Sequence, residues 1–425
     1  MQAFVDLRPL RETPAFRRLW LGNTLSIVGG QLTMVAVLYQ TWSMTDSTVA
    51  VGAIGIAQAI PTVVLGLIGG SLADAIDRRR LVLATTVGQI VASGLLAAQA
   101  YAGLDSLPVL LGLVAFHSGC GGLGAPARRT FPVRLLPDGL VSAGVALNHL
   151  SFQISMLVGP ALAGVVMGAG GVRTCYLIDT LTFVAALYGV TRLPSIRPQL
   201  GSAQLGSAQG GPTRPSVGAI WSSWRFIGTQ PVLRGAFLID LLATVMAMPL
   251  ALFPTINDER FGGDPETLGL FFSAIALGGI VAGAMSGLAT RSARPAVVML
   301  VAASVWGVGL AGFGLAQQLW LALGCLAIAG AADTTSVITR GSIVQRATPD
   351  SQRGRVSAVE HIVGVSGPHM GNFRGGLVAG VTSATLATVS GGLLCAAGIG
   401  VIAASNRALR RFTVRQDERE PAMVD

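Results

Sequence analysis

The sequence is a succession of long apolar stretches, each followed by a short polar, charged or proline-containing break. A helix needs about 20 mostly apolar residues to cross a bilayer. Twelve stretches meet this requirement: 19–41, 49–73, 81–102, 107–127, 141–168, 173–193, 235–256, 267–289, 295–316, 319–340, 357–380 and 384–405. The breaks include DRRR at 77–80 and RSARP at 291–295. The sequence therefore predicts an all-α polytopic membrane protein.

Composition excludes the other broad classes. Only 12% of the 425 residues are charged and 52% are hydrophobic, whereas a soluble domain carries about 25% charged residues. The apolar content is too high for a disordered chain, and the glycines lack the strict period of collagen. The four cysteines, Cys120, Cys175, Cys325 and Cys395, show no CxxC spacing. We therefore expect them to be small packing residues, with no metal or redox site and no cofactor.

The basic residues orient the predicted spans. The formal net charge is +9, and all 29 basic residues are arginines. An even number of spans places both termini on one side of the membrane, and that side receives every arginine except Arg173, Arg260 and Arg374. The positive-inside rule assigns it to the cytoplasm. The charge is thus a topology signal rather than a sign of nucleic-acid binding. The first 17 residues lack the apolar core of a signal peptide, so the first span is expected to direct insertion.

The longest interruption, residues 194–230, divides the spans into two groups of six. Its first half is rich in Pro, Gly, Ser and Gln, which is typical of a flexible linker. Trp221, Trp224 and Phe226 in its second half are expected at the membrane interface. The predicted organisation is an N-terminal six-helix bundle over 1–193, a cytoplasmic linker over 194–230, a C-terminal six-helix bundle over 231–405 and a cytoplasmic tail over 406–425.

The two halves contain matching segments. TPAFRRLWL before the first span corresponds to TQPVLRGAFL before the seventh, with Arg17 and Arg234 offset by 217 residues. GSLADAIDRR after the second span corresponds to SGLATRSARP after the eighth, with Leu72 and Leu288 offset by 216. LLPDG and ATPDS follow the fourth and tenth spans at an offset of 212. Three matches at nearly one offset indicate two repeated bundles around a central path.

The loop between the second and third spans, GSLADAIDRRRL, resembles the G-x-L-a-D-x-x-x-R-[RK] motif of the major facilitator superfamily. Asp77 stands where that family usually has Gly. The positions that match the motif are Gly70, Leu72, Asp74, Arg78 and Arg79. Contacts of this loop would favour one access state of a transporter and break in the other, so the resemblance implies a gating loop. A plain cluster of cytoplasmic positive charges is the alternative.

The fifth span contains SMLVGPALAG at 155–164, which resembles the antiporter helix motif G-x-x-x-G-P-x-x-x-G. Gly159, Pro160 and Gly164 match it, and Ser155 replaces its first Gly. Glycine permits close helix contact, and proline removes a backbone donor, so a local kink is expected here. Ordinary glycine-rich membrane packing is the alternative.

Over its whole length the chain is similar to the drug:proton antiporter branch of this superfamily, which contains enterobactin (siderophore) exporters and macrolide efflux proteins. The segments that carry the similarity are TPAFRRLWLGNTLSIVG, MTDSTVAVG, ALGGIVAGAMSGLATRSARP and QRATPDSQRGRVSA. The resemblance implies two pseudo-symmetric six-helix bundles and proton-coupled export of a siderophore-like or amphipathic small molecule across the cell membrane. A multidrug or macrolide pump is the close alternative, and a non-transporting membrane scaffold or sensor is the alternative from another class.

Ionisable residues inside membrane spans are costly and are therefore functional candidates. Asp240 in the seventh span is the first choice for proton coupling, because a carboxyl group removed from water can exchange protons near neutral pH. His117 and Asp333 are further candidates. Asp333 and Arg340 are seven residues apart on one helix face and form a candidate structural pair. Asp179, near the outer end of the sixth span, is expected to meet solvent.

His369 and Arg374 in the eleventh span are candidates for contact with an anionic or catechol-bearing substrate. Each of these ionisable residues has a purely structural role as its alternative. Trp42, Trp306 and Trp320 lie near span ends and are expected to anchor at the interface, with stacking of one of them on the substrate as the alternative. The sequence contains no Walker loop, no HExxH and no GxGxxG after a strand. We therefore expect no enzymatic activity, and partners limited to a small-molecule substrate, protons and lipid, with the protein acting as a monomer.

Overall fold

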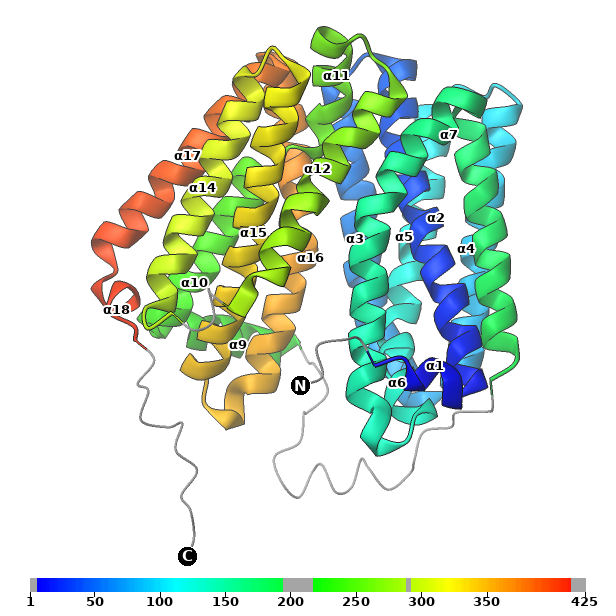
Figure 1. Cartoon of the computed structure of the whole chain (residues 1–425), viewed down its shortest axis with the longest axis horizontal. Coiled ribbons are helices and arrows are strands. Elements are labelled where there is room, and N and C mark those ends of the chain that lie inside the picture. Colours follow the sequence, from blue (N-terminus) through cyan, green and yellow to red (C-terminus); the bar gives the residue numbers. More distant parts are fainter. Residues whose placement is uncertain (1–5, 194–216, 288–291, 414–425) are drawn as a thin grey trace, which may run out of the picture. The chain divides into compact units, whose positions relative to one another are not determined.

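The computed structural model describes residues 6–193, 217–287 and 292–413, and in these ranges the chain forms helices and no β-strand (Figure 1). This confirms the predicted all-α class. The predicted linker residues 194–216, the break residues 288–291 with the repeat position Leu288, and the tail residues 414–425 lie outside the described residues. The predicted domain boundaries stay a prediction.

The chain divides into two compact units. Unit 1 comprises Met1–Arg214, Leu250–Ser273 and Asn372–Ala384, and unit 2 comprises Pro215–Pro249, Ala274–Gly371 and Thr385–Asp425. Two long helices, α12 (Pro265–Ala284) and α16 (Asp350–Val381), therefore begin in one unit and end in the other.

Unit 1 contains the first six predicted spans. Its helices up to residue 191 are α1 (Arg8–Glu12), α2 (Pro14–Thr45), α3 (Thr48–Ala75), α4 (Arg78–Tyr101), α5 (Leu107–Arg129), α6 (Phe131–Leu135), a 3-10 turn (Asp138–Leu140) and α7 (Val141–Thr191). The fifth and sixth spans both lie in α7, which is interrupted at Gly171, where φ is 74°. Glycine adopts this left-handed conformation without the steric cost that a Cβ would add. The break predicted between residues 168 and 173 is therefore confirmed.

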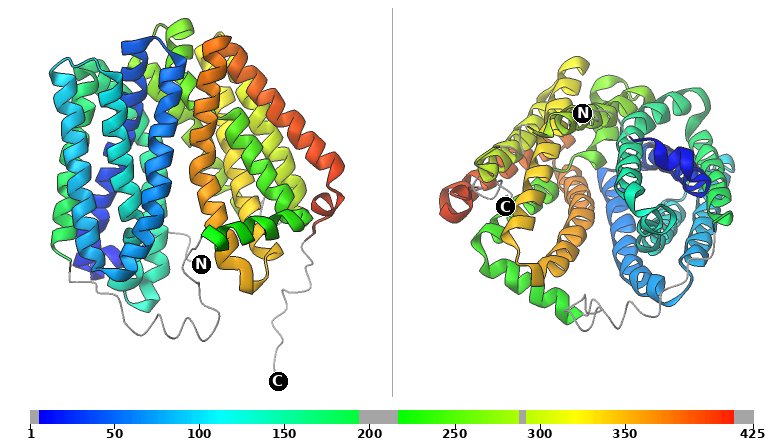
Figure 2. Two further views of the ribbon diagram at one scale, coloured as in Figure 1. Left: turned by 180° about the vertical axis from the view of Figure 1, so that it is seen from behind. Right: turned by 60° about the horizontal axis from the view of Figure 1, so that its bottom comes forward.

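Close backbone contacts hold the helices of unit 1 together. α2 packs along α7, and α3 packs along α5 (Figure 2). A Cβ atom at Gly22 of α2 would lie 2.8 Å from Cα of Ala186 in α7, and a Cβ atom at Gly122 of α5 would lie 2.8 Å from Cα of Thr62 in α3. Since lipid supplies no hydrophobic drive for helix association, such close approach of small residues is a main source of attraction. Close helix packing is therefore a reason for the large number of glycines, 56, in the sequence.

The remaining helices carry the later predicted spans. They are α9 (Val217–Thr229), α10 (Pro231–Leu241), a π-helical turn (Leu242–Met246), a 3-10 turn (Leu250–Leu252), α11 (Phe253–Phe261), α12, α14 (Pro295–Leu315), α15 (Leu319–Ala347), α16, α17 (Ala384–Ser405) and α18 (Arg407–Arg410). α14 ends and α15 begins on either side of Gln317 and Gln318, which confirms the predicted break there.

Ten helical runs in the described ranges are long and apolar enough to cross a membrane. One of them, Asp138–Thr191, holds two of the predicted spans. α16 is a long helix at the position of the eleventh span but is not among the ten. Its central part carries His361, His369, Asn372 and Arg374, whose polar side chains lower its mean hydropathy. Within the described residues, the twelve predicted spans therefore lie in helical segments, and the seventh, 235–256, is interrupted at residues 248–249.

α9 falls in the second half of the predicted linker. It runs crosswise to the long helices of unit 2 (Figure 2). Trp224 of α9 contacts Phe237 of α10 edge to face, with ring centroids 6.4 Å apart. This orientation fits a helix that lies along a membrane surface, and the interfacial position of its aromatic residues stays a prediction.

Candidate functional site

The first candidate site lies in unit 2, where one arginine faces two acids. An Nη1 atom of Arg340 on α15 forms an ion pair with Oδ1 of Asp240 on α10. Nε of Arg340 lies 3.8 Å from Oε1 of Glu360 on α16. The side chains of Asp240 and Arg340 are 7% and 11% exposed, so both charges lie inside the unit. Each of the two charges is stabilised by the other, because an isolated buried charge is very costly in free energy.

This arrangement corrects the expected pairing of Arg340. Arg340 forms its ion pairs with Asp240 and Glu360, and not with Asp333, which lies two helical turns earlier on α15. Helical spacing shows which residues share a face but not which neighbouring helix covers that face. Glu360 is the member that sequence reasoning missed, although an acid four residues into the eleventh span was a signal for it. The coupling roles of Asp240 and Asp333 stay predictions.

The helix that carries Asp240 changes geometry directly after it. Residues Leu242–Met246 form a π-helical turn, which leaves backbone carbonyl groups without their usual partners. Nε1 of Trp306 on α14 donates a hydrogen bond of 3.2 Å to the carbonyl oxygen of Ala243. Trp306 is 4% exposed, so the expectation that it anchors at the membrane interface is wrong. Its apolar ring is buried by packing, and its polar atom is satisfied by the irregular helix.

The second candidate site is a buried carboxylate in unit 1. Oδ2 of Asp179 on α7 accepts hydrogen bonds from Oγ1 of Thr33 at 2.8 Å and from Oγ of Ser93 at 2.7 Å. Asp179 is 0% exposed, so the expectation that it meets solvent is wrong. α7 turns it toward α2 and α4, which supply the two hydroxyl donors. Thr33 and Ser93, polar residues at positions otherwise surrounded by apolar ones, were the sequence signal for this site.

His117 on α5 lies close to Asp179. Its Nε2 atom lies 3.9 Å from Oδ2 of Asp179, and its ring contacts Phe183 edge to face at 5.5 Å. This separation is too long for a hydrogen bond, but a small movement or a bridging water would connect the two groups. The structure therefore brings His117 together with an acid that was not among its expected partners. Its role in proton coupling stays a prediction.

A further polar layer in unit 1 joins three of its helices. The Tyr176 hydroxyl on α7 donates to Oε1 of Gln40 on α2 at 2.7 Å. Gln99 on α4 donates to the same oxygen at 3.1 Å through Nε2. These buried groups satisfy one another, as groups out of reach of water must. The layer fixes the mutual rotation of α2, α4 and α7 on which the Asp179 site depends.

The loop between α3 and α4 holds the predicted gating residues. Nη2 of Arg78 lies 3.3 Å from Oδ1 of Asp74, whose side chain is 79% exposed. Nη2 of Arg79 donates a 2.6 Å hydrogen bond to the carbonyl oxygen of Thr191, at the end of α7. Asp77, the departure from the family motif, caps α4 by accepting from the backbone N–H of Arg79 at 2.9 Å. A Cβ atom at Gly70 would meet nothing within 4 Å. The gating role of these residues stays a prediction.

The predicted antiporter helix motif packs closely within unit 1. A Cβ atom at Gly159 would lie 2.5 Å from Cβ of Gln31 in α2. A Cβ atom at Gly164 would lie 2.8 Å from Cα of Glu266 at the start of α12, and the carbonyl of Pro160 faces Gly269. Oγ of Ser273 donates a 2.9 Å hydrogen bond to the carbonyl oxygen of Leu157. The motif is thus a contact surface on two sides, which is the expected close helix contact; its part in transport stays a prediction.

The two candidate substrate residues lie on α16 in different units. His369 belongs to unit 2 and Arg374 to unit 1, and both are half-buried. Nδ1 of His369 is a buried atom with no hydrogen-bond partner among the described residues. Contact of either residue with substrate stays a prediction. No group of three or more His, Cys, Asp or Glu in the described ranges is placed to hold a metal ion.

The chain has many apolar helices, and an ion pair and a carboxylate are buried among them. These features are typical of polytopic membrane transport proteins. The chain belongs to the transmembrane secretion effector family of the major facilitator superfamily, whose family model matches residues 5–422. It therefore has the fold of that superfamily, twelve transmembrane helices in two pseudo-symmetric bundles of six, as predicted.

Curated relatives match nearly the full length. The chain is 28% identical over 414 residues to the enterobactin exporter EntS of Citrobacter koseri, which covers 96% of this chain and 95% of the relative. It is 29% identical over 417 residues to the enterobactin exporter EntS of Salmonella typhi, which covers 96% of both chains.

Solved structures share the fold at low identity. The nucleoside transporter NupG superposes with a TM-score of 0.71 at 11% identity, covering 94% of this chain and 100% of the other. A bacterial homologue of the iron transporter ferroportin, in an inward-facing state, superposes with a TM-score of 0.65 at 16% identity, covering 92% and 98%. At these identities the similarity shows the fold alone.

Proposed function

We propose that this protein is a secondary active exporter of the cell (inner) membrane, which moves a siderophore-like, amphipathic small molecule out of the cell in exchange for protons. The observation that carries the proposal is the match at 28–29% identity to enterobactin exporters, which extends over at least 95% of both chains. The family model extends over residues 5–422, a range that includes every predicted span and both candidate sites. We therefore assign the activity and the broad class of substrate, and not enterobactin itself.

The triad of Asp240, Arg340 and Glu360 supports proton coupling. Arg340 has two acids within reach, one in an ion pair and one at 3.8 Å. If Asp240 takes up a proton, Arg340 keeps a counter-charge by moving toward Glu360, so neither state leaves a buried charge alone. Protonation would thus shift α10 and α16 relative to α15. A proton-driven movement of packed helices is what an antiporter needs to link the gradient to its access states.

The pair of Asp179 and His117 supports a second proton site in unit 1. Asp179 accepts from two hydroxyl groups, and among the described residues its basic neighbour is His117, whose Nε2 lies 3.9 Å away. A proton on either group would create a direct hydrogen bond between them after a small approach. We place Asp179 beside His117 as a coupling candidate, in addition to Asp240 and Asp333.

The orientation in this proposal has both termini in the cytoplasm, with the arginine-rich loops on the same side and in contact with lipid phosphate. The protein acts as a monomer, and no nucleic acid takes part. Single cysteines placed at Asp105, between α4 and α5, and at Asp138, after α6, lie on opposite sides in this topology. In a variant without the four native cysteines, an impermeant thiol reagent added to intact cells would label position 105 and spare 138. The reverse pattern would overturn the orientation.

Transport is tested with the purified full-length chain in proteoliposomes under an imposed pH gradient. The expected result is movement of a tricatecholate siderophore that the pH gradient accelerates. When an ionophore collapses the gradient, this increase in transport rate should disappear. Movement of a macrolide and not of the catecholate would favour the multidrug alternative. Failure to move either class across several tested compounds would leave the scaffold or sensor alternative.

Proton coupling is tested with Asp240→Asn, which keeps the size of the side chain and removes its charge. The variant is expected to abolish gradient-driven transport. Asp258→Asn is the matched control, because Asp258 is an exposed acid near the end of α11, beyond the predicted seventh span, and accepts a 3.3 Å bond from Trp42. Wild-type transport by Asp240→Asn would remove Asp240 from the mechanism.

A further inference from the structure

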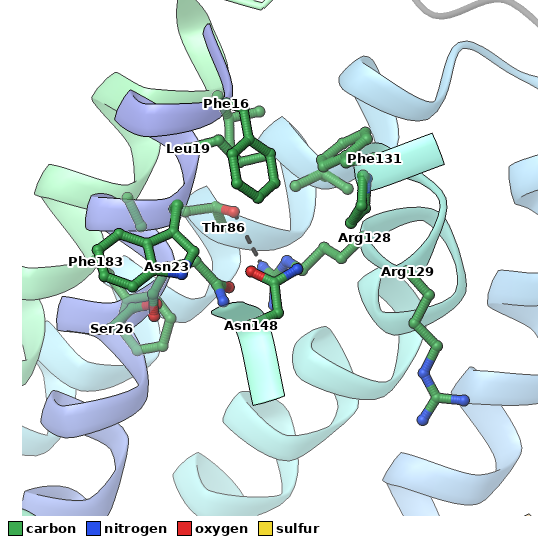
Figure 3. Close-up of a pocket in the computed structure, with 15 residues that line it drawn as sticks. Phe16, Leu19, Asn23, Ser26, Thr86, Arg128, Arg129, Phe131, Asn148 and Phe183 are labelled. Atoms are coloured by element: carbon green, nitrogen blue, oxygen red, sulfur yellow. Dashed lines mark hydrogen bonds between the residues drawn. The ribbon is translucent and has the colours of Figure 1, made fainter. Parts of the chain in front are cut away.

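A cavity of about 190 Å³ lies inside unit 1, bounded by α2, α4, α5, α6 and α7. It adjoins the Asp179 site, because Phe183 in its wall contacts the ring of His117. Neither Asp179 nor His117 lines it, and the proposed function assigns it no role. Its walls come from the beginnings of α2 and α4 and from the ends of α5 and α7 (Figure 3). These are the ends of the helices that adjoin the arginine-rich loops of residues 78–80 and 128–134.

Aromatic side chains form much of the cavity wall. They stand on three elements: Phe16 and Trp20 on α2, Phe131 on α6 and Phe183 on α7. Flat π faces from several directions fit a flat, unsaturated ligand better than a flexible chain, because ring contacts gain from offset-stacked and edge-to-face geometry.

One guanidinium group reaches into this aromatic cavity. Nη2 of Arg128 donates hydrogen bonds to Oγ1 of Thr86 at 3.0 Å and to Oε1 of Gln89 at 2.7 Å. Figure 3 shows Arg128 extending toward Thr86 and Asn148, whereas Arg129 points away. Arg128 directly follows the predicted fourth span, 107–127, and belongs to the last turn of α5, which carries its side chain inward.

The charge of Arg128 has no counter-charge within the described ranges. Its two hydrogen-bond partners are neutral, and no carboxylate oxygen of the described residues lies within 4.0 Å of its nitrogens. A half-buried cation without an anion is costly, and a bound anion would remove that cost. The neutral side chains of Asn23, Ser26 and Asn148 add donors and acceptors beside it.

We propose that this cavity binds one aromatic ring that carries a negatively charged oxygen group, such as an aryl carboxylate. Arg128 binds the charged oxygens, and the four aromatic side chains enclose the ring. The size agrees, since an apolar cavity of about 150 Å³ takes up benzene, and 190 Å³ leaves room for one small substituent. The cavity is too small for several linked rings, so the ligand is a single-ring acid or one ring of a larger molecule.

The test is equilibrium dialysis of radiolabelled benzoate against the purified full-length protein in detergent. Wild type is expected to bind benzoate saturably. Unlabelled benzoate should displace the label at concentrations at least about tenfold lower than two analogues do. These are benzamide, which lacks the charge, and cyclohexanecarboxylate, which lacks the flat ring. Equal competition by benzamide, or no saturable binding, would overturn the proposal.

Variants locate the binding in this cavity. Arg128→Gln should weaken benzoate binding at least about tenfold, because it removes the charge and keeps a donor toward Thr86. Arg134→Gln, a change of the same kind at an exposed arginine of α6 that does not line the cavity, should bind as wild type does. Loss of binding in Arg134→Gln to the same extent would point to a nonspecific effect of net charge and refute the site.

A third variant keeps the test decisive if Arg128→Gln does not fold. Asn148→Phe fills the cavity with a side chain and leaves Arg128, Thr86 and Gln89 unchanged. It should abolish benzoate binding while its elution profile stays that of wild type. Undiminished binding by Asn148→Phe would place benzoate elsewhere. Since the assay measures binding alone, a protein that exports its substrate and does not bind benzoate would disprove this site and leave the transport proposal intact.

Discussion

Arg340 on α15 forms an ion pair with Asp240 on α10, and the same guanidinium lies 3.8 Å from Glu360 on α16. One cation therefore links two consecutive helices, α15 and α16, to α10, which lies about a hundred residues earlier in the sequence. Both members of the pair are nearly inaccessible. The stability of these helices and their response to protons thus depend on the same few atoms.

A double-mutant cycle should reveal the mutual dependence of Asp240 and Arg340. Asp240→Asn and Arg340→Gln each leave one buried charge without its partner and should lower the melting temperature in detergent. The double variant removes both charges and should be more stable than the sum of the two effects predicts, with a coupling free energy of about 0.5–3 kcal/mol. Strict additivity would show that the two residues do not interact in the folded protein.

Two substitutions of Asp179 should distinguish a structural role of this residue from a role in proton coupling. Asp179→Asn keeps an oxygen that can accept from Thr33 and Ser93, so the protein should fold normally and lose part of its gradient-driven transport. Asp179→Leu leaves both hydroxyl groups without their acceptor and should destabilise the protein by about 1–3 kcal/mol. Thermal unfolding and transport measured on the same preparations distinguish the two effects. Normal transport by Asp179→Asn would leave Asp179 with a structural role only.

Two glycines of α2 provide a matched pair for helix packing. A Cβ atom at Gly22 would lie 2.8 Å from Cα of Ala186, whereas one at Gly30 would meet nothing within 4 Å. Gly22→Ala should therefore force α2 and α7 apart and cost about 1–3 kcal/mol. Gly30→Ala should be neutral or stabilising by about 0.5–1 kcal/mol, because alanine favours the helix. Thermal melts of the two variants check the difference, and equal melting temperatures would argue against close packing at Gly22.

Arg79 should matter more than its neighbour Arg80. Nη2 of Arg79 donates a 2.6 Å hydrogen bond to the end of α7, while Arg80 is exposed. Arg79→Gln should slow transport several-fold, because the loop loses its link to Thr191, and Arg80→Gln should transport normally. Since both variants lose one positive charge, a simple charge effect would slow both to the same degree. That result would favour the positive-inside alternative for the whole loop.

Much of the architecture follows from local properties of the sequence. The twelve predicted spans fall on helical segments of the described residues, since about 20 apolar residues with no water nearby must satisfy their backbone groups internally. Gly171 marks the break inside α7 because a left-handed backbone is a local property of glycine. The family motifs also depend on neighbouring residues only, and the match over residues 5–422 agrees with them.

The partners of the residues in the candidate sites depend on contacts between helices. Arg340 was expected beside Asp333 and is paired with Asp240 and Glu360, and Asp179 was expected in solvent and accepts two buried hydrogen bonds. Arg128 lies just beyond the predicted fourth span and extends into an aromatic cavity. Hydropathy and charge order the spans and indicate their orientation, because each span meets lipid by itself. The rotation of each helix and the partner of each buried charge were decided only by tertiary packing, since they depend on which side chains neighbouring helices present.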